Sequence, residues 1–259
     1  MGRLNVIKIG GNVIDNEELL EHFLDNLAEL PQPLVVVHGG GAIATGLSKK
    51  LGIEVKMVNG RRVTDSETIK VATMVYAGLV NKKLVAALQK RGVNAFGLCG
   101  ADGDCIRSGK RNSEDIDWGF VGDVLPDGVN GSLLERLLEA GIVPVMCAIT
   151  HDGNGNLLNT NADTIAKEVA SALAGIYDVE LTYCFEKQGV LADPSDDESY
   201  IPEITPDNYH ELVESKVIAG GMIPKLDNAF LSLKHGVKRV LIKHAANITN
   251  TKQTVVKLS

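Results

Sequence analysis

Two short apolar runs that each end in glycine constrain the fold of this chain more than any other feature. Residues 6–9 lead into Gly10 and Gly11, and residues 34–38 lead into the triplet 39–41. Short β-branched runs bounded by glycine are typical of buried strands in a parallel sheet. Ligands bind beyond the carboxyl ends of such strands, where glycine lets backbone N–H groups approach anionic oxygens. The sequence therefore predicts an anion-binding site in an α/β protein.

Composition narrows the class of protein. The 259 residues suit one large α/β unit or two modest domains. Lys plus Arg number 26 against 33 Asp plus Glu, a net charge of −7 that argues against nucleic-acid binding. No uninterrupted apolar run is long enough to span a membrane, and no signal peptide is visible, so we expect a cytoplasmic protein. The four cysteines form no Cys-x-x-Cys pair, and we expect reduced thiols and no protein-bound metal.

Helical patterns alternate with the apolar runs, which predicts βαβ units. We expect a long helix from Asp65, its N-cap, towards Lys90, and a strand and turn over 53–64. The pattern restarts near Gly175, and a final edge strand is predicted over 254–258. We therefore expect one domain over residues 1–175 and a second over 176–259.

Lysines near the predicted strand and helix ends strengthen the anion-site interpretation. Lys8 lies inside the first apolar run, where an ammonium group facing no partner would be costly to bury. Lys225 follows Gly220 and Gly221 at the start of a predicted helix, a combination that favours anion binding. Asn161 or Asp163 could cap another helix while the other faces the site.

A dinucleotide-binding fold is the main alternative from these residues. Gly39-x-Gly41-x-x-Ala44 fits the Gly-x-Gly-x-x-Gly/Ala pattern after a strand, which would suit an NAD-dependent oxidoreductase. No acidic residue stands clearly at the end of the following strand, and the pattern leaves Lys8 unexplained. No Walker A motif is present.

Five ordered motifs together resemble the amino acid kinase family over nearly the whole chain. They are Lys8-Ile9-Gly10-Gly11, His38-Gly39-Gly40-Gly41, Asn59-Gly60-Arg61-Arg62-Val63-Thr64, Asn159-Thr160-Asn161-Ala162-Asp163 and Gly221-Met222-Ile223-Pro224-Lys225. Asp102-Gly103-Asp104 also fits a family pattern. The resemblance implies a three-layer αβα sandwich with an open, mainly parallel eight-stranded sheet. It implies ATP-dependent phosphorylation of the side-chain carboxylate of N-acetyl-L-glutamate, in arginine biosynthesis, with Mg²⁺ carried by ATP.

The resemblance also assigns roles to residues. Lys8 and Lys225 would neutralise the transferring and leaving phosphates, Asp163 would orient both lysines, and Gly11 would donate a backbone N–H group. The acylated amino acid would be bound in the N-terminal domain by Gly40, Gly41, Arg62 and Asn159. The nucleotide would be bound in the C-terminal domain and at the first glycine exit by Gly10, Glu186, Gly189, Val190, Leu191 and Ala219.

Some features leave the interpretation open. Where the family usually has Ser-Asp-Val-x-Gly, this chain has Phe185-Glu186-Lys187-Gln188-Gly189, beside the expected nucleotide. The same chemistry on N-succinylglutamate or an N-acylaminoadipate stays possible, as does a non-catalytic nucleotide-binding regulator. Few residues precede the first strand, and by comparison with the family we expect a homodimer that is insensitive to arginine.

Overall fold

The computed structural model describes residues 1–58 and 60–259, which form two compact units. Unit 1 comprises Met1–Leu34 and Ala166–Ser259, and unit 2 comprises Val35–Ile165. The first strand therefore packs with the C-terminal part of the chain. The boundary near residue 175, expected because the pattern of strands and helices restarts there, stays a prediction, as do the binding roles of the two predicted domains.

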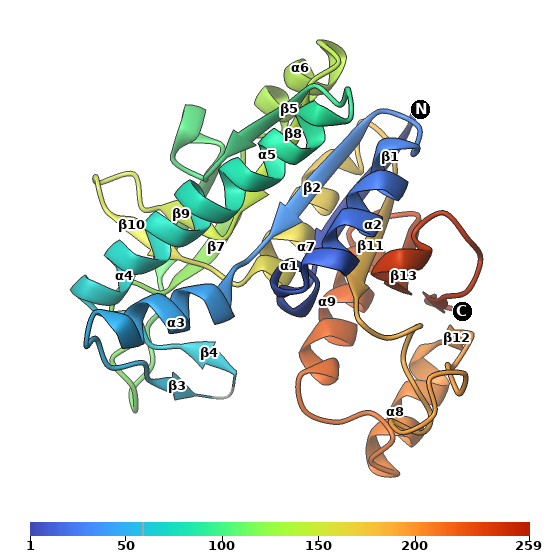
Figure 1. The fold of residues 1–259 in the computed structure, drawn as a ribbon. Helices are drawn as coiled ribbons and strands as arrows, with labels where there is room; N and C mark the ends of the chain where they lie inside the picture. Colours follow the sequence, from blue (N-terminus) through green and yellow to red (C-terminus); the bar gives the residue numbers. More distant parts are fainter. Residues whose placement is uncertain (59) are drawn as a thin grey trace. The chain divides into compact units, whose positions relative to one another are not determined.

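Five strands of unit 1 form a run in the order β12-β14-β13-β11-β1, paired in parallel except at β13–β14 (Figure 1). Its elements are β1 (Arg3–Ile9), α1 (Gly11–Asp15), α2 (Glu17–Ala28), β11 (Asp178–Phe185), β12 (Glu203–Ile204), α8 (Pro206–Glu214), α9 (Met222–Lys234), β13 (Arg239–His244), η3 (Ala245–Asn247) and β14 (Thr254–Val256). The prediction of β14 as an edge strand was wrong, because the two-residue β12 pairs with its outer side. So short a strand carries no periodic signal in the sequence.

Three parallel strands of unit 2 form a run in the order β2-β8-β5. The elements of this part are β2 (Leu34–His38), α3 (Gly41–Lys50), β3 (Met57–Val58), β4 (Arg61–Arg62), α4 (Ser66–Thr73), η1 (Met74–Val80), α5 (Asn81–Lys90), β5 (Ala95–Leu98), η2 (Asp102–Asp104), β6 (Ile106–Lys110), β7 (Gly122–Val129), α6 (Gly131–Glu139), β8 (Val143–Cys147), β9 (Ile149–His151) and β10 (Leu157–Asn159). A smaller sheet has the order β10-β9-β6-β7. Strand β3 pairs with β4 in an antiparallel arrangement within residues 53–64, where a strand and turn were predicted. Helix α7 (Ala162–Leu173) begins in unit 2.

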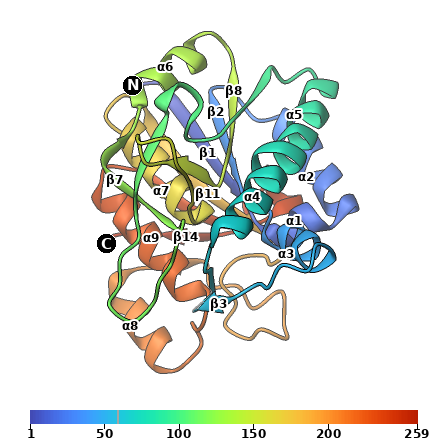
Figure 2. The same cartoon turned by 90° about the vertical axis from the view of Figure 1, so that its left-hand side faces the viewer.

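Helices cover both faces of the strands within each unit. In Figure 2, α2 and α9 lie on opposite sides of β1 and β11 in unit 1, and α5 and α6 lie on opposite sides of β8 in unit 2. The strands between them are buried and apolar, as in the five consecutive buried residues of β2 and of β8. Burial on both faces explains why these strands read as continuous apolar runs rather than alternating ones.

The long predicted helix is present as α4, the π-helical stretch η1 and α5, which run in line in Figure 2. Asp65 caps it as predicted, because its Oδ1 accepts from the backbone N–H groups of Glu67 at 3.1 Å and Thr68 at 2.7 Å. Among the described residues, Ser66–Lys90 is the one helix long and apolar enough to cross a membrane by length and composition, and 44% of its most apolar window is buried. The core helix of a soluble protein passes the same test.

Candidate functional site

A cavity of about 190 Å³ in unit 2 lies at the carboxyl end of β2. The glycine triplet that follows β2 forms part of its wall, together with Arg62, Tyr76 and Asn159. The volume suits a small metabolite, because drug-sized ligands occupy roughly 300–1,000 Å³. The structure therefore brings together in one cavity the four residues predicted to bind the acylated amino acid: Gly40, Gly41, Arg62 and Asn159.

Arg62 is the only charged residue of this set, and it is 8% exposed. Its Nη2 donates to the backbone oxygen of Gly41 at 2.9 Å and to Oγ1 of Thr45 at 2.7 Å. Its Nη1 is buried and has no hydrogen-bond partner among the described residues. A guanidinium group held on one side with a donor left over is suited to bind a carboxylate. Asn59, the first residue of the predicted motif 59–64, lies outside the described residues.

Gly40 needs to be glycine for two reasons. Its φ of +151° is one that residues with a Cβ rarely adopt, and an added Cβ would lie 3.0 Å from Cδ1 of the Tyr76 ring. Tyr76 itself is 5% exposed. Burial raises the pKa of its hydroxyl, while the nearby Arg62 acts in the opposite direction. Sequence reasoning missed Tyr76, because a tyrosine within a helical run carries no local sign of a ligand site.

A buried network supports the backbone of the glycine triplet. Nδ1 of His38 donates to the backbone oxygen of Gly39 at 2.8 Å, which leaves Nε2 to accept from Nδ2 of Asn81 at 2.9 Å. Burial lowers the pKa of His38 to about 4, so the ring is neutral at physiological pH. Nδ2 of Asn81 also donates to the backbone oxygen of Val145 at 2.9 Å. The network fixes the tautomer of His38 and the direction of the Gly39 carbonyl.

The polar residues before α7 have different roles, one in the cavity wall and one as the helix cap. Nδ2 of Asn159 donates to Oγ1 of Thr64 at 3.0 Å, which orients the amide in the cavity wall. Oδ1 of Asn161 accepts from the backbone N–H groups of Asp163 at 2.8 Å and Thr164 at 3.0 Å. Asn161 is thus the N-cap, and Asp163 lies in the first turn of α7. This decides between the two residues that the sequence left open as caps.

In unit 1, residues predicted to bind the phosphates lie near the carboxyl ends of β1 and β11 and at the start of α9. Lys8 is 9% exposed on β1 and is paired in register with Tyr183 of β11. The backbone N–H of Gly10 donates to the backbone oxygen of Cys184 at 2.8 Å. A Cβ added to Gly11, the first residue of α1, would meet nothing within 4 Å, so this backbone is open to a ligand. Lys225 lies in the first turn of α9, whose N-terminus has no side-chain cap.

The residues predicted to contact the nucleotide separate into two groups in unit 1. Glu186 is exposed, and its Oε1 accepts from Nδ2 of Asn12 at 2.7 Å, beside the first glycine exit. Ala219 is also exposed, next to the start of α9. Gly189, Val190 and Leu191 are buried instead, and Val190 donates its backbone N–H to Oγ1 of Thr254 at 2.9 Å. These three residues follow β11 and are packed against the protein, and their contact with a nucleotide stays a prediction.

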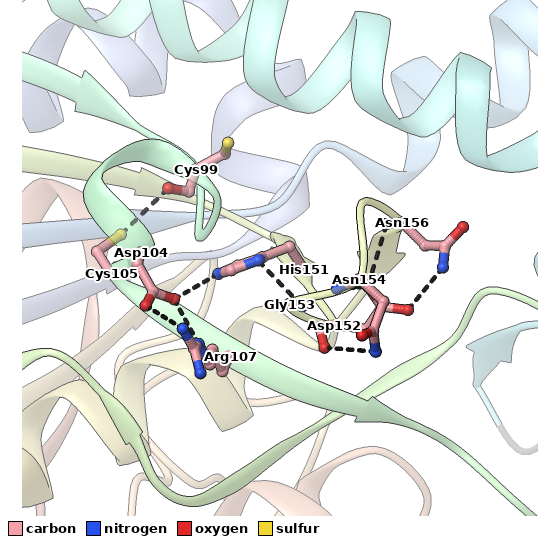
Figure 3. A network of polar contacts seen from close by, with 9 residues as sticks. All are labelled: Cys99, Asp104, Cys105, Arg107, His151, Asp152, Gly153, Asn154 and Asn156. Atoms are coloured by element: carbon pink, nitrogen blue, oxygen red, sulfur yellow. Dashed lines mark hydrogen bonds and ion pairs between the residues drawn. The ribbon is translucent and has the colours of Figure 1, made fainter.

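A polar network at η2 and β9 lies outside the cavity and braces the smaller sheet (Figure 3). Asp104 accepts from Nε and Nη2 of Arg107 at 2.7 and 2.6 Å and is 2.8 Å from Nε2 of His151. Asp102, from the same family motif, accepts from the backbone N–H of Cys99 at 2.7 Å. These bonds hold the loop between β5 and β6, so the motif 102–104 has a structural explanation.

Neither thiols nor metal-binding clusters add further chemistry to the described part of the chain. The four cysteines are free, and burial raises the pKa of Cys105, Cys147 and Cys184 to about 12. Protonated thiols are poor nucleophiles and metal ligands. No group of three or more His, Cys, Asp or Glu residues suited to a metal ion occurs among residues 1–58 and 60–259.

Comparison with known proteins defines the class. The model of the amino acid kinase family matches residues 3–244, and the chain belongs to this family. Acetylglutamate kinases from Phocaeicola vulgatus and Bacteroides thetaiotaomicron are each 54% identical over 255 residues, covering 98% of this chain and 98% of the relative. The crystal structure of smu.665 from Streptococcus mutans is 28% identical with a TM-score of 0.80, covering 99% of each chain. The predicted family and α/β fold are confirmed.

Proposed function

We propose that this chain transfers the γ-phosphoryl group of ATP to the side-chain carboxylate of N-acetyl-L-glutamate, giving an acyl phosphate in arginine biosynthesis. It is a kinase by family, and its relatives at 54% identity over nearly their full length are acetylglutamate kinases. These relatives bear out the enzyme class that the sequence predicted. The buried Nη1 of Arg62, available in a cavity of about 190 Å³, is the structural observation that carries the substrate assignment.

Unit 2 is the proposed site of the acylated amino acid. Arg62 would bind the α-carboxylate through Nη1, and the amide of Asn159 and the backbone N–H groups of Gly40 and Gly41 would bind the remaining polar atoms. The attacking carboxylate is ionised near neutral pH and requires no general base. This part of the reaction therefore depends on orientation rather than proton transfer.

Unit 1, which contains residues 176–259 together with the first glycine exit, is the proposed site of ATP. Lys8 and Lys225 would neutralise the phosphates, and Gly11 would donate its backbone N–H group to them. Gly10, whose own N–H donates to the backbone oxygen of Cys184, would lie beside the nucleotide. Glu186, which accepts from Asn12 next to Gly11, and Ala219, which precedes α9, are both exposed and would contact the rest of the nucleotide. Mg²⁺ would be bound mainly by phosphate oxygens, which is consistent with the chemistry of a hard cation.

A hydroxamate assay tests the substrate directly, since hydroxylamine traps an acyl phosphate as it forms. We expect product with ATP, Mg²⁺ and N-acetyl-L-glutamate, and a lower kcat/KM with N-succinylglutamate or an N-acetylaminoadipate. Free glutamate is the matched control for the acyl group. A panel in which another acyl derivative has the highest kcat/KM would change the substrate, and no acyl phosphate from any of them would overturn the kinase proposal.

A homodimer built on unit 2 is proposed from its exposed apolar side chains. Met74 and Leu79 on η1 and Phe96 on β5 are 53%, 47% and 52% exposed. Lys82 donates from Nζ to the backbone oxygen of Gly97 at 3.2 Å, so the start of α5 lies against β5. Large apolar side chains on neighbouring elements favour burial against a second copy. Light scattering should give twice the chain mass of 27.7 kDa for the native protein and about the monomer mass for L79E/F96E.

We also propose a cytoplasmic location. Four free cysteines, three of them buried, are typical of a reducing compartment. Fractionation of cells that express the chain should recover it with soluble cytoplasmic markers, and recovery with the membrane fraction would contradict this location.

A further inference from the structure

Two aromatic rings of β11 lie next to the ammonium group of Lys225 in unit 1. Nζ of Lys225 is 5.4 Å from the centroid of the Tyr183 ring and 5.6 Å from that of Phe185. Both distances are within the roughly 6 Å over which a cation is attracted to the face of an aromatic ring. Two ring contacts restrict the position of the Lys225 nitrogen more than one would, because each ring attracts it from a different direction.

The strand and the helix explain why the three side chains meet. Tyr183 and Phe185 are two residues apart on β11 and therefore point to the same face of the sheet. Tyr183 is fully buried, and Phe185 is partly exposed at the end of the strand. Lys225 comes from the first turn of α9 and is partly exposed. The rings are thus held by the strand, while the flexible lysine side chain depends on its contacts for its direction.

Lys8 and Lys225 bring two positive charges to one face of this end of β11. Lys8 on β1 is in register with Tyr183 and so lies on the same face of the sheet as the two rings. Lys243 on β13 is in register with Cys184 on the opposite face, where its Nζ donates to the backbone oxygens of Ile248 and Asn250. Burial raises the pKa of Cys184, while Lys243, Lys8 and Lys225 act in the opposite direction. Ammonium groups gathered in this way repel one another. Aromatic faces attract an ammonium group without adding a charge of their own.

We propose that Tyr183 and Phe185 are positioning residues that hold the ammonium group of Lys225 in place for the nucleotide phosphates. This rests on the proposed function, in which Lys225 binds ATP. Phe185 stands where the family pattern described above has serine, so its ring is a feature that the motif did not predict. The inference gives Phe185, the first residue of the departure at 185–187, a role in the reaction.

A double-mutant cycle on Phe185 and Lys225 tests the energetic part. The readout is the Kd for a non-hydrolysable ATP analogue with Mg²⁺, measured by titration calorimetry. We expect F185L to weaken binding by about 2- to 30-fold, as the loss of one cation–π contact implies. F185Y keeps an aromatic ring and should bind the analogue as the native protein does. In a K225A background, F185L should cause no further change. Equal effects of F185L in both backgrounds, or no effect in the native one, would overturn the proposal.

Proton chemical shifts test the geometry without relying on catalysis. In the ligand-free protein the ε-methylene protons of Lys225, identified by their loss in K225A, should show an upfield ring-current shift. The shift should decrease in F185L and persist in F185Y. F230L is a matched control, because Phe230 is on the same helix but packs against Tyr209, with ring centroids 5.3 Å apart. It should alter stability without moving the Lys225 signals.

The two proposals fail in different ways. If no acyl phosphate forms and K225A binds the ATP analogue as well as the native protein, the proposed function is wrong. If acyl phosphate forms normally but the Lys225 protons show no ring-current shift, only the role of the two rings is wrong.

Discussion

Nε2 of His38 accepts a hydrogen bond from Nδ2 of Asn81 across 2.9 Å, although the two residues are 43 positions apart. The contact joins the last residue of β2 to the first residue of α5. Because Nδ1 of the same ring donates to the Gly39 carbonyl, one neutral imidazole connects the long helix to the glycine triplet. The lining of the candidate substrate cavity is therefore supported from within the core of unit 2.

Because His38 is buried in its neutral form, the free energy of unfolding should depend on pH. The pKa of about 4 in the folded chain is below the ordinary value of 6.5, so the unfolded chain binds more protons between these values. The stabilisation is present above pH 6.5 and is lost as pH falls towards 4, by up to about 3 kcal/mol. Urea unfolding of the native protein and of H38Q at several pH values should show a steeper decline for the native protein. Parallel declines would contradict this role.

Gly97 leaves the space that Asn81 occupies. A Cβ at residue 97 would lie 2.0 Å from Oδ1 of Asn81, whose amide is held by two hydrogen bonds. We expect G97A to lower the free energy of unfolding by roughly 1–3 kcal/mol. G46A is the control, because Gly46 is solvent-exposed in the middle of α3 and a Cβ there meets nothing within 4 Å. Alanine should stabilise that helix by up to about 1 kcal/mol. Denaturant titration measures the free energy of unfolding of both variants. Equal stability of G97A and the native chain would contradict the packing argument.

Replacement of Arg62 by lysine should weaken binding of the acylated amino acid, although the positive charge is kept. A lysine at residue 62 cannot both hold the Gly41 carbonyl and present a second donor in a fixed plane. We expect R62K to raise KM for N-acetyl-L-glutamate by roughly 10- to 100-fold, the loss of a hydrogen bond to a charged group, with KM for ATP little changed. R107K serves as the control, because Arg107 is exposed and pairs with Asp104 outside the cavity. An unchanged KM for the acyl substrate in R62K would remove Arg62 from the binding role.

Local signals in the sequence predicted the parts of the site that depend on neighbouring residues. The strands before the glycines were evident because burial on both faces makes them continuously apolar. The cap at Asp65 was evident because its hydrogen bonds reach only two or three residues ahead. The sequence left the cap of α7 open between Asn161 and Asp163, and the hydrogen bonds assign it to Asn161. The role of Asn81 and the ring of Tyr76 over Gly40 were not predictable, because each depends on which distant segments pack together. The β9–β10 hairpin was missed for another reason, as strands of three residues have no periodicity to detect.

Lys8 provides the sharpest kinetic test of the proposed phosphoryl transfer. Lys8 is 9% exposed near the end of β1, and a transition state with charge spread over phosphate oxygens would gain more from its positive charge than the bound substrates do. We therefore expect K8A to lower kcat far more than it changes KM for N-acetyl-L-glutamate, which is proposed to bind in unit 2. K70A is the control, because Lys70 is exposed and pairs with Glu67 on α4. Steady-state kinetics with the hydroxamate readout measures both constants. A K8A enzyme that retains most of its turnover would mean that another group stabilises the transferring phosphate, since the loss of a catalytic cation cannot leave the chemical step unchanged.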